Sequence, residues 1–168
     1  MPRILVAYAT KTGSTKAAAE EIQRVLAKKN FDAEVRPMSE IKSLDGYDGI
    51  VVGAPINGMK WLPEATAFVL AHKAEMCKVP VAYFLMSYLL FEGGSGIKAT
   101  IQKSLVSVQE SVPTISTGMF PGKLEKAMPL FLRLLFGVKN GRPLDITDMP
   151  HVSAWASDIA GMMRSRMH

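Results

Sequence analysis

The sequence has little of what disulfide frameworks, metal centres and membrane spans require. Its 168 residues include one cysteine, Cys77, so no internal disulfide can form. The three histidines are scattered and lack the spacing of metal ligands. No apolar run approaches the ~20 residues that cross a bilayer. We therefore expect no metal and no membrane-spanning helix, with Cys77 as a buried, inert thiol in a reducing cytoplasm.

Several loop motifs that mark other α/β enzymes are also missing. The chain has no G-x-x-x-x-G-K-[ST] loop, no G-x-G-x-x-G fingerprint and no G-x-S-x-G nucleophile elbow. The apolar run over 49–54 leads into Pro55 without an acidic residue, which excludes the phospho-accepting aspartate of a response regulator. Basic residues are not interleaved with aromatic ones, so we expect no nucleic acid among the partners.

What is present is the composition of one folded, mildly basic domain over residues 1–168. Apolar residues make up 48% of the chain, which excludes a disordered protein, and the formal net charge is +5. A basic surface favours anionic partners such as phospholipid headgroups or carboxylated substrates. The start, Met1-Pro2-Arg3, leads straight into an apolar run and does not resemble a signal peptide. We expect a cytoplasmic protein, either free or peripheral to the inner face of the membrane.

Predicted strands and helices alternate along the chain. Apolar runs and apolar–polar alternation predict strands over 3–9, 33–36, 49–54, 81–86 and 114–117. Apolar residues at helical spacing predict helices over 15–29, from 63 onward, over 97–108 and from 148 onward. Strands that alternate with helices form a parallel sheet covered on both faces. The sequence therefore predicts an α/β domain that binds its ligand at the carboxyl edge of the sheet.

The stretch 10–16 joins the first predicted strand to the first predicted helix. It contains four hydroxyl side chains, and Gly13 permits a tight backbone there. The first N–H groups of a helix are unpaired and carry the positive end of its dipole, so such a loop can hold a phosphate. The alternative is that Ser14 or Thr15 merely caps the helix.

The pattern Thr10-x-Thr12-Gly13-x-Thr15 after a buried strand resembles the phosphate loop of the flavodoxin family. The stretch 47–55 is similar to that family's third strand and its exit. This resemblance implies a flavodoxin-like, doubly wound, five-stranded parallel sheet of order 2-1-3-4-5 and non-covalently bound FMN. It implies that the first loop holds the phosphate and that the loops from Pro55 and Ser87 flank the flavin ring. The cofactor-binding residues expected from it are Thr10, Lys11, Thr12, Gly13, Ser14, Thr15, Pro55, Ile56, Asn57, Gly58, Met59, Trp61, Ser87, Tyr88, Leu89 and Gly93.

Several of these residues have a structural alternative. Trp61 and Tyr88 either contact the flavin ring or pack in the core. Asn57 either lies at the ring or only favours the turn. A flavin site needs an apolar wall and a few polar contacts to the ring, and no side chain is identified as catalytic.

An extra apolar helical segment, at about 118–147, departs from a minimal domain. Between 123 and 136 the apolar residues are too many for a narrow buried stripe. We expect Pro129 to kink this helix or to start a second one, and Gly137 to end it. An apolar, basic helix of this kind rests on a membrane surface or packs in the core or in a dimer contact.

Together with the basic chain and the loop that follows 53–56, this segment resembles the flavodoxin-type protoporphyrinogen dehydrogenases of bacterial haem synthesis. The resemblance implies an FMN-dependent oxidoreductase with a porphyrin-type substrate and a quinone or an electron-transfer protein as redox partner. The region 92–109 departs from that family, whose insertion there is longer and more basic. Two other functions stay open, a soluble flavodoxin electron carrier and a non-redox binding module on the same fold.

Overall fold

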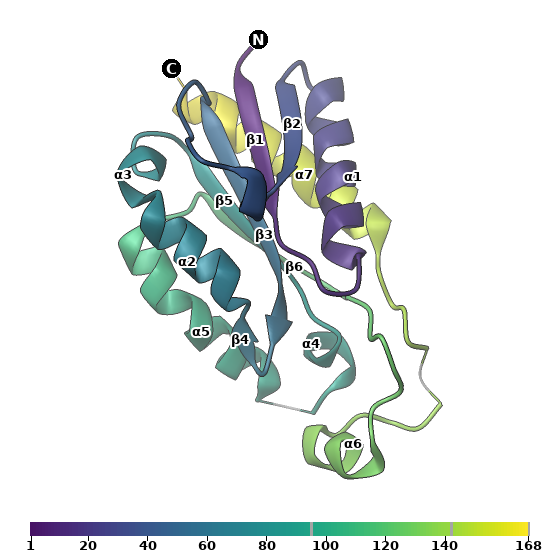
Figure 1. The fold of residues 1–168 in the computed structure, drawn as a ribbon. Coiled ribbons are helices and arrows are strands. Elements are labelled where there is room, and N and C mark those ends of the chain that lie inside the picture. Colours follow the sequence, from purple (N-terminus) through teal and green to yellow (C-terminus); the bar gives the residue numbers. More distant parts are fainter. Residues whose placement is uncertain (95, 142, 168) are drawn as a thin grey trace.

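A parallel sheet lies at the centre of the chain (Figure 1). The computed structural model describes residues 1–94, 96–141 and 143–167. The parallel strands run in the order β2-β1-β3-β5-β6, which confirms the predicted order 2-1-3-4-5. Their bounds are β1 (Arg3–Tyr8), β2 (Asp32–Pro37), β3 (Gly49–Asn57), β5 (Val81–Met86) and β6 (Ser116–Phe120).

Helices cover both faces of the sheet, because successive strand residues point to opposite sides. Leu5 and Ala7 of β1 belong to the core beneath α2 (Pro63–Ala71), α3 (Lys73–Met76) and α5 (Ile97–Ser111). Their neighbours Ile4 and Val6 belong to the core beneath α1 (Ser14–Lys28) and α7 (Met149–Arg166). Both cores are apolar, which explains why the central strands lack polar alternation. Two short helices, η1 (Met38–Glu40) and α4 (Leu89–Glu92), lie in loops.

The third strand runs further than the sequence predicts. Residues 55–57, expected to be a loop, extend β3 into a hairpin with β4 (Lys60–Trp61). Gly58 and Met59 both have positive φ angles, 58° and 66°, as the central residues of a tight hairpin turn require. The usual hairpin signal places Asn-Gly at the two central positions, whereas here Asn57 is the last residue of β3 and the central pair is Gly58-Met59.

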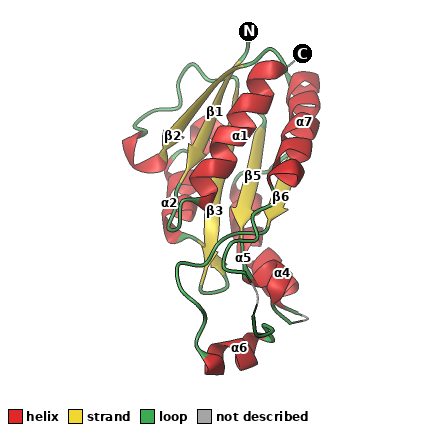
Figure 2. Cartoon of the chain, turned by 90° about the vertical axis from the view of Figure 1, so that its right-hand side faces the viewer, coloured by secondary structure: helices red, strands yellow, loops and turns green. Residues whose placement is uncertain are grey.

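The segment after β6 leaves the body of the domain and returns to it (Figure 2). It is helical only over α6 (Leu130–Phe136), so the expected helix over 123–129 is wrong. The reason is Pro129, whose extended backbone makes it the N-cap of α6. Gly137, with φ 69°, ends α6 as predicted. The outgoing and returning strands of the segment pair at Lys123 and Asp145.

Cys77 departs from its expected state. The residue is exposed at the end of α3, and its thiol donates a weak hydrogen bond to the Ser111 carbonyl at 3.7 Å. The lone cysteine therefore has no place in either core.

We predict that Gly53→Ala destabilises the fold, because a Cβ at Gly53 would lie 1.9 Å from Cζ of the buried Phe84 ring. Such overpacking lowers the free energy of unfolding by about 1–3 kcal/mol. The matched control is Gly161→Ala, since nothing lies within 4 Å of a Cβ on this helical glycine. That change should raise the free energy of unfolding by about 0.5–1 kcal/mol. Urea unfolding of both variants checks the pair, and equal effects would contradict the packing described here.

A second prediction concerns Glu21, which joins α1 to α7. Its carboxylate accepts hydrogen bonds from Arg24 Nε at 2.7 Å and from the Ser153 hydroxyl. The Arg24 guanidinium, followed by the Ser153 hydroxyl, lowers the pKa of Glu21 from 4.5 to about 2, against an opposing effect of partial burial. A carboxyl group with a lowered pKa stabilises the fold above its unfolded-state value, and this contribution disappears as the pH falls from 4.5 towards 2.

Glu21→Gln should therefore lower the unfolding free energy at neutral pH and flatten its decline between pH 4.5 and 2. The control is the neighbouring Glu20→Gln, because Glu20 meets only Lys16, at 3.9 Å, on an exposed face. Chemical unfolding across this pH range is the measurement. Parallel curves for wild type and Glu21→Gln would show that the Glu21 pairing does not hold in solution.

Candidate functional site

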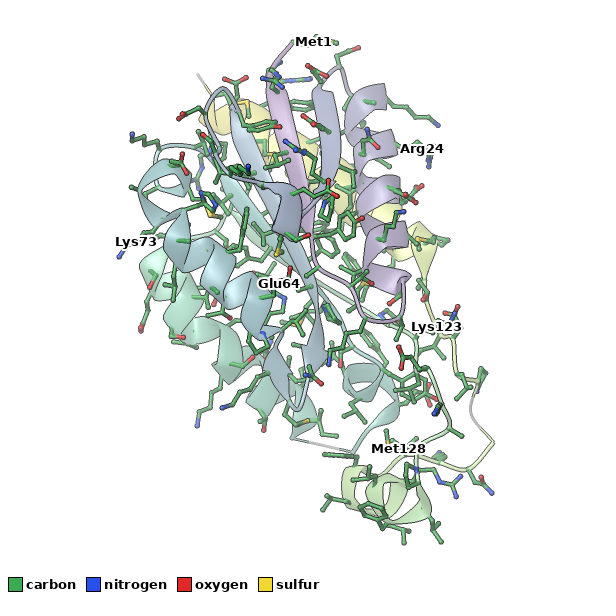
Figure 3. The ribbon with its side chains drawn as sticks, in the orientation of Figure 1. Met1, Arg24, Glu64, Lys73, Lys123 and Met128 are labelled. Carbon is green, nitrogen blue, oxygen red and sulfur yellow. The ribbon has the colours of Figure 1, made fainter. Side chains whose placement is uncertain are left out.

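A cavity of about 440 Å³ opens at the carboxyl ends of the strands. Four loops form it, the ones that follow β1, β3, β5 and β6. This is the edge where ligands of open α/β sheets bind, as the sequence predicts. Figure 3 marks the edge with Lys123 and Met128, at the opposite end of the molecule from Met1.

The first wall is the loop between β1 and α1, which contributes Lys11, Thr12 and Ser14. Gly13 is the N-cap of α1, with φ 89°, and no side chain caps the helix. The expectation that Ser14 or Thr15 might serve only as the cap is therefore wrong. The first turn also lacks acidic residues, so the positive end of the helix dipole is not offset there.

Hydrogen bonds within this loop hold it in shape. The Thr10 hydroxyl accepts a hydrogen bond from the Gly13 N–H at 3.0 Å. The Thr12 and Ser14 hydroxyl oxygens lie 3.2 Å apart, within hydrogen-bond distance. The loop is thus already curled around the helix start, and Thr10 and Gly13 shape it from outside the cavity lining.

Thr15 carries a buried hydroxyl without a hydrogen-bond partner. Its side chain is fully buried, and its Oγ1 is one of two such atoms in the described part of the chain. An unsatisfied buried polar group costs about 1–3 kcal/mol. Thr15 does not itself line the cavity, although it lies in the first turn of α1. An anion held at this turn would offer its hydroxyl an acceptor.

The second wall is the exit of β3, where Pro55, Ile56 and Gly58 line the cavity. The Asn57 side chain is exposed, and Met59 packs against the core cluster beneath α2. The polar groups that this loop offers to a ligand are those of its backbone, next to Gly58 with its positive φ.

Trp61 and Gly93 were expected at the cofactor site, but neither lines the cavity. The Trp61 side chain is buried, its Nε1 donates to the Ala54 carbonyl at 3.1 Å, and its ring centroid lies 5.1 Å from that of Tyr83. Trp61 therefore packs in the core, which was its alternative role. Gly93 lies in a tight contact, where a Cβ would come within 2.6 Å of the Leu89 carbonyl oxygen.

The third wall is the loop after β5, which contributes Ser87, Tyr88 and Leu89. The Ser87 hydroxyl accepts a hydrogen bond from the Leu90 N–H at 3.1 Å. The buried Tyr88 donates its hydroxyl to the Pro143 carbonyl at 2.7 Å. Tyr88 thus lines the cavity and ties the loop to the segment that returns from α6, and its contact with a flavin ring stays a prediction.

The fourth wall was missed by sequence reasoning. It is the extended segment after β6, where Gly122, Leu124 and Met128 line the cavity with Lys123, Glu125 and Lys126. The signal that points to it is topological, because the loop after every parallel strand leaves the sheet at the same edge. Two lysines on this wall make the cavity rim favourable for anionic groups.

Metal-binding clusters and membrane-spanning helices are both absent from the described part of the chain. Within residues 1–94, 96–141 and 143–167, no group of three or more His, Cys, Asp or Glu side chains is arranged to hold a metal ion. In the same ranges, no helix has the length and apolarity that crossing a bilayer requires.

Solved structures of similar fold include several flavodoxins. A flavodoxin from the domain Archaea shares 20% identity, with a TM-score of 0.63 over 96% of this chain and 99% of that one. The two-electron reduced flavodoxin of Megasphaera elsdenii shares 18% identity, with a TM-score of 0.57 over 92% of this chain and 98% of that one. A flavodoxin, WrbA-like protein from Agrobacterium tumefaciens shares 14% identity, with a TM-score of 0.62 over 99% of each chain.

At these identities the likeness shows the fold alone. No curated protein matches the sequence significantly. The model of the flavodoxin domain family matches residues 5–133, a stretch that includes the phosphate-loop pattern and all the parallel strands except the first residues of β1. The chain therefore belongs to the flavodoxin domain family.

Proposed function

We propose that the chain binds FMN in this cavity and acts as an FMN-dependent oxidoreductase. The observation that carries the proposal is the start of α1, where an uncapped helix end meets the unpartnered hydroxyl of Thr15. A phosphate dianion supplies acceptors for both. The family supports the same cofactor, since flavodoxin domains typically bind FMN.

The first three walls of the cavity then have a role toward the cofactor. The hydroxyls of Thr12, Ser14 and Thr15 and the N–H groups of the first turn hold the phosphate, and Lys11 adds screened attraction. Ile56, Tyr88 and Leu89 form the apolar wall that excludes water from the ring. The backbone at 56–59 offers hydrogen bonds to the ring nitrogens and oxygens. FMN itself supplies the electron-transfer chemistry when bound.

We propose as the finer function a protoporphyrinogen dehydrogenase activity linked to a quinone. Lys123 and Lys126 on the cavity rim support it, because a porphyrin-type substrate carries carboxylates. The apolar segment that follows them supports a lipid-soluble electron acceptor. A flavodoxin electron carrier is the second candidate, favoured by the likeness in fold to two flavodoxins along nearly their whole length.

The first prediction here concerns FMN affinity. Thr15→Val removes a buried hydroxyl that lacks a hydrogen-bond partner in the protein. The free energy of unfolding of the variant should therefore be equal to that of wild type or higher. Affinity for FMN should fall about 10–100-fold, the effect of losing a hydrogen bond to a charged group. Quenching of flavin fluorescence during titration of the apoprotein measures this affinity.

Riboflavin, which lacks the phosphate, separates the phosphate contact from the ring contacts, and its affinity should not change in Thr15→Val. The control variant is Thr100→Val on α5, a helix that also begins after a glycine N-cap of positive φ and lies outside the cavity. If wild-type apoprotein takes up no FMN, the proposal fails and a non-redox binding module replaces it. If both flavins lose affinity equally, the phosphate does not lie at α1.

The second prediction separates the enzyme from the carrier. Oxidised holoprotein offered protoporphyrinogen and menaquinone without oxygen should produce fluorescent porphyrin in multiple turnovers. Lys123→Gln with Lys126→Gln should raise KM about two- to fivefold with less effect on kcat, as for partly exposed ion pairs. Absence of turnover, together with rapid electron exchange with a ferredoxin-type protein, would assign the carrier function instead.

A further inference from the structure

Helix α6 turns apolar side chains toward solvent, the reverse of an ordinary surface helix. Large apolar side chains occupy positions i, i+1, i+4 and i+5, which share one face. This face, the α6 patch, consists of Leu130 (62% exposed), Phe131 (69%), Leu134 (75%) and Leu135 (72%). A helix on a water-covered surface normally turns its polar residues outward and its apolar residues inward. The outward face of α6 therefore suits an apolar environment.

The inward side of α6 carries its only charge. The Arg133 guanidinium hydrogen bonds to the Asn140 side chain, and its Nε is buried. Phe136, on the same side, packs against the core cluster beneath α2 and α5. The two sides of α6 therefore differ. Arg133 and Phe136 make the contacts with the rest of the domain, and the four apolar side chains of the patch face solvent.

The body of the domain holds α6 in this orientation. The Gly94 N–H donates to the Phe136 carbonyl at 2.5 Å, and a Cβ on Gly137 would lie 3.1 Å from the Gly94 Cα. The Val138 N–H donates to the Arg133 carbonyl at 2.9 Å and closes the helix end. Figures 1 and 2 both show α6 projecting beyond the carboxyl edge of the sheet. The patch is therefore a convex projection rather than the wall of a groove.

The segment that carries the patch is basic. Between 122 and 141 there are four basic residues, Lys123, Lys126, Arg133 and Lys139, and one acidic residue, Glu125. Lys139 is exposed just beyond the end of α6, whereas Lys123 and Lys126 line the cavity and Arg133 lies on the inward side. A projecting apolar surface on a basic segment complements a bilayer whose headgroups are anionic. A second copy of the chain would bring two basic segments together.

We propose that the α6 patch docks this protein on the surface of a membrane that contains anionic lipids. The four apolar side chains enter the boundary between headgroups and acyl chains, and the exposed Lys139 meets the lipid phosphates. Because α6 is ~10 Å long, it lies in the interface and does not span the bilayer. The proposal goes beyond the FMN function and does not depend on it.

The test is co-sedimentation of the full chain with vesicles of phosphatidylcholine and phosphatidylglycerol. Wild type should sediment with them at low salt, less at high salt, and less with phosphatidylcholine alone. The triple change Phe131→Ser, Leu134→Ser, Leu135→Ser should lower the partition coefficient at least about tenfold. Lys139→Gln, at an exposed residue outside the cavity, should lower it about fivefold.

The matched control is Leu70→Ser with Val106→Ser, which removes two exposed apolar side chains (51% and 45%) from α2 and α5. This variant should sediment like wild type. Circular dichroism and, where FMN is bound, the flavin spectrum should be unchanged in all variants, because every substituted side chain is solvent-exposed. Failure of wild type to sediment at low salt overturns the proposal. So does equal loss in the control, or a wild-type dimer that the triple variant converts to a monomer without any vesicle binding.

Discussion

The free amide end of α1 is the constraint around which the site is built. A buried strand delivers the chain to the edge of the sheet, and Gly13 turns it through a left-handed conformation straight into a helix. The turn leaves no residue in position to cap the helix with its side chain. Donors at a helix start need acceptors, and here no carboxylate of the first turn supplies them. The unpaired donors and the buried Thr15 hydroxyl therefore both favour an anion at this helix start.

The parallel sheet turns this local requirement into a binding site. Because every parallel strand ends at the same edge, the loops after β3, β5 and β6 converge on the start of α1. Two of these loops bring apolar and backbone groups, and the loop after β6 brings lysines. Under the proposed function, phosphate, ring and substrate would be recognised by different loops, an arrangement that lets one fold serve several redox reactions.

Continuous apolar runs were sufficient to place the strands, whereas their order followed from the resemblance to the flavodoxin family. A cluster of hydroxyls around Gly13 was sufficient to mark the loop at the start of α1. Trp61 was harder, since an aromatic residue next to a ligand loop packs equally well against a ligand or against Tyr83. Its hydrogen bond to Ala54 arises only when β3 and β4 form a hairpin. The wall over 122–128 was missed because its apolar content concealed an extended segment that depends on pairing with residues far along the chain.

The pairing of this segment links the cavity to α6. Leu124 N–H donates to the Leu144 carbonyl at 2.8 Å and Ile146 N–H to the Gly122 carbonyl at 3.2 Å, so the fourth wall pairs with the segment that returns from α6. The Tyr88 hydroxyl fixes this returning segment to the third wall. Hydrogen bonds of fixed geometry, rather than proximity alone, therefore connect the third and fourth walls of the cavity to the segment that carries α6.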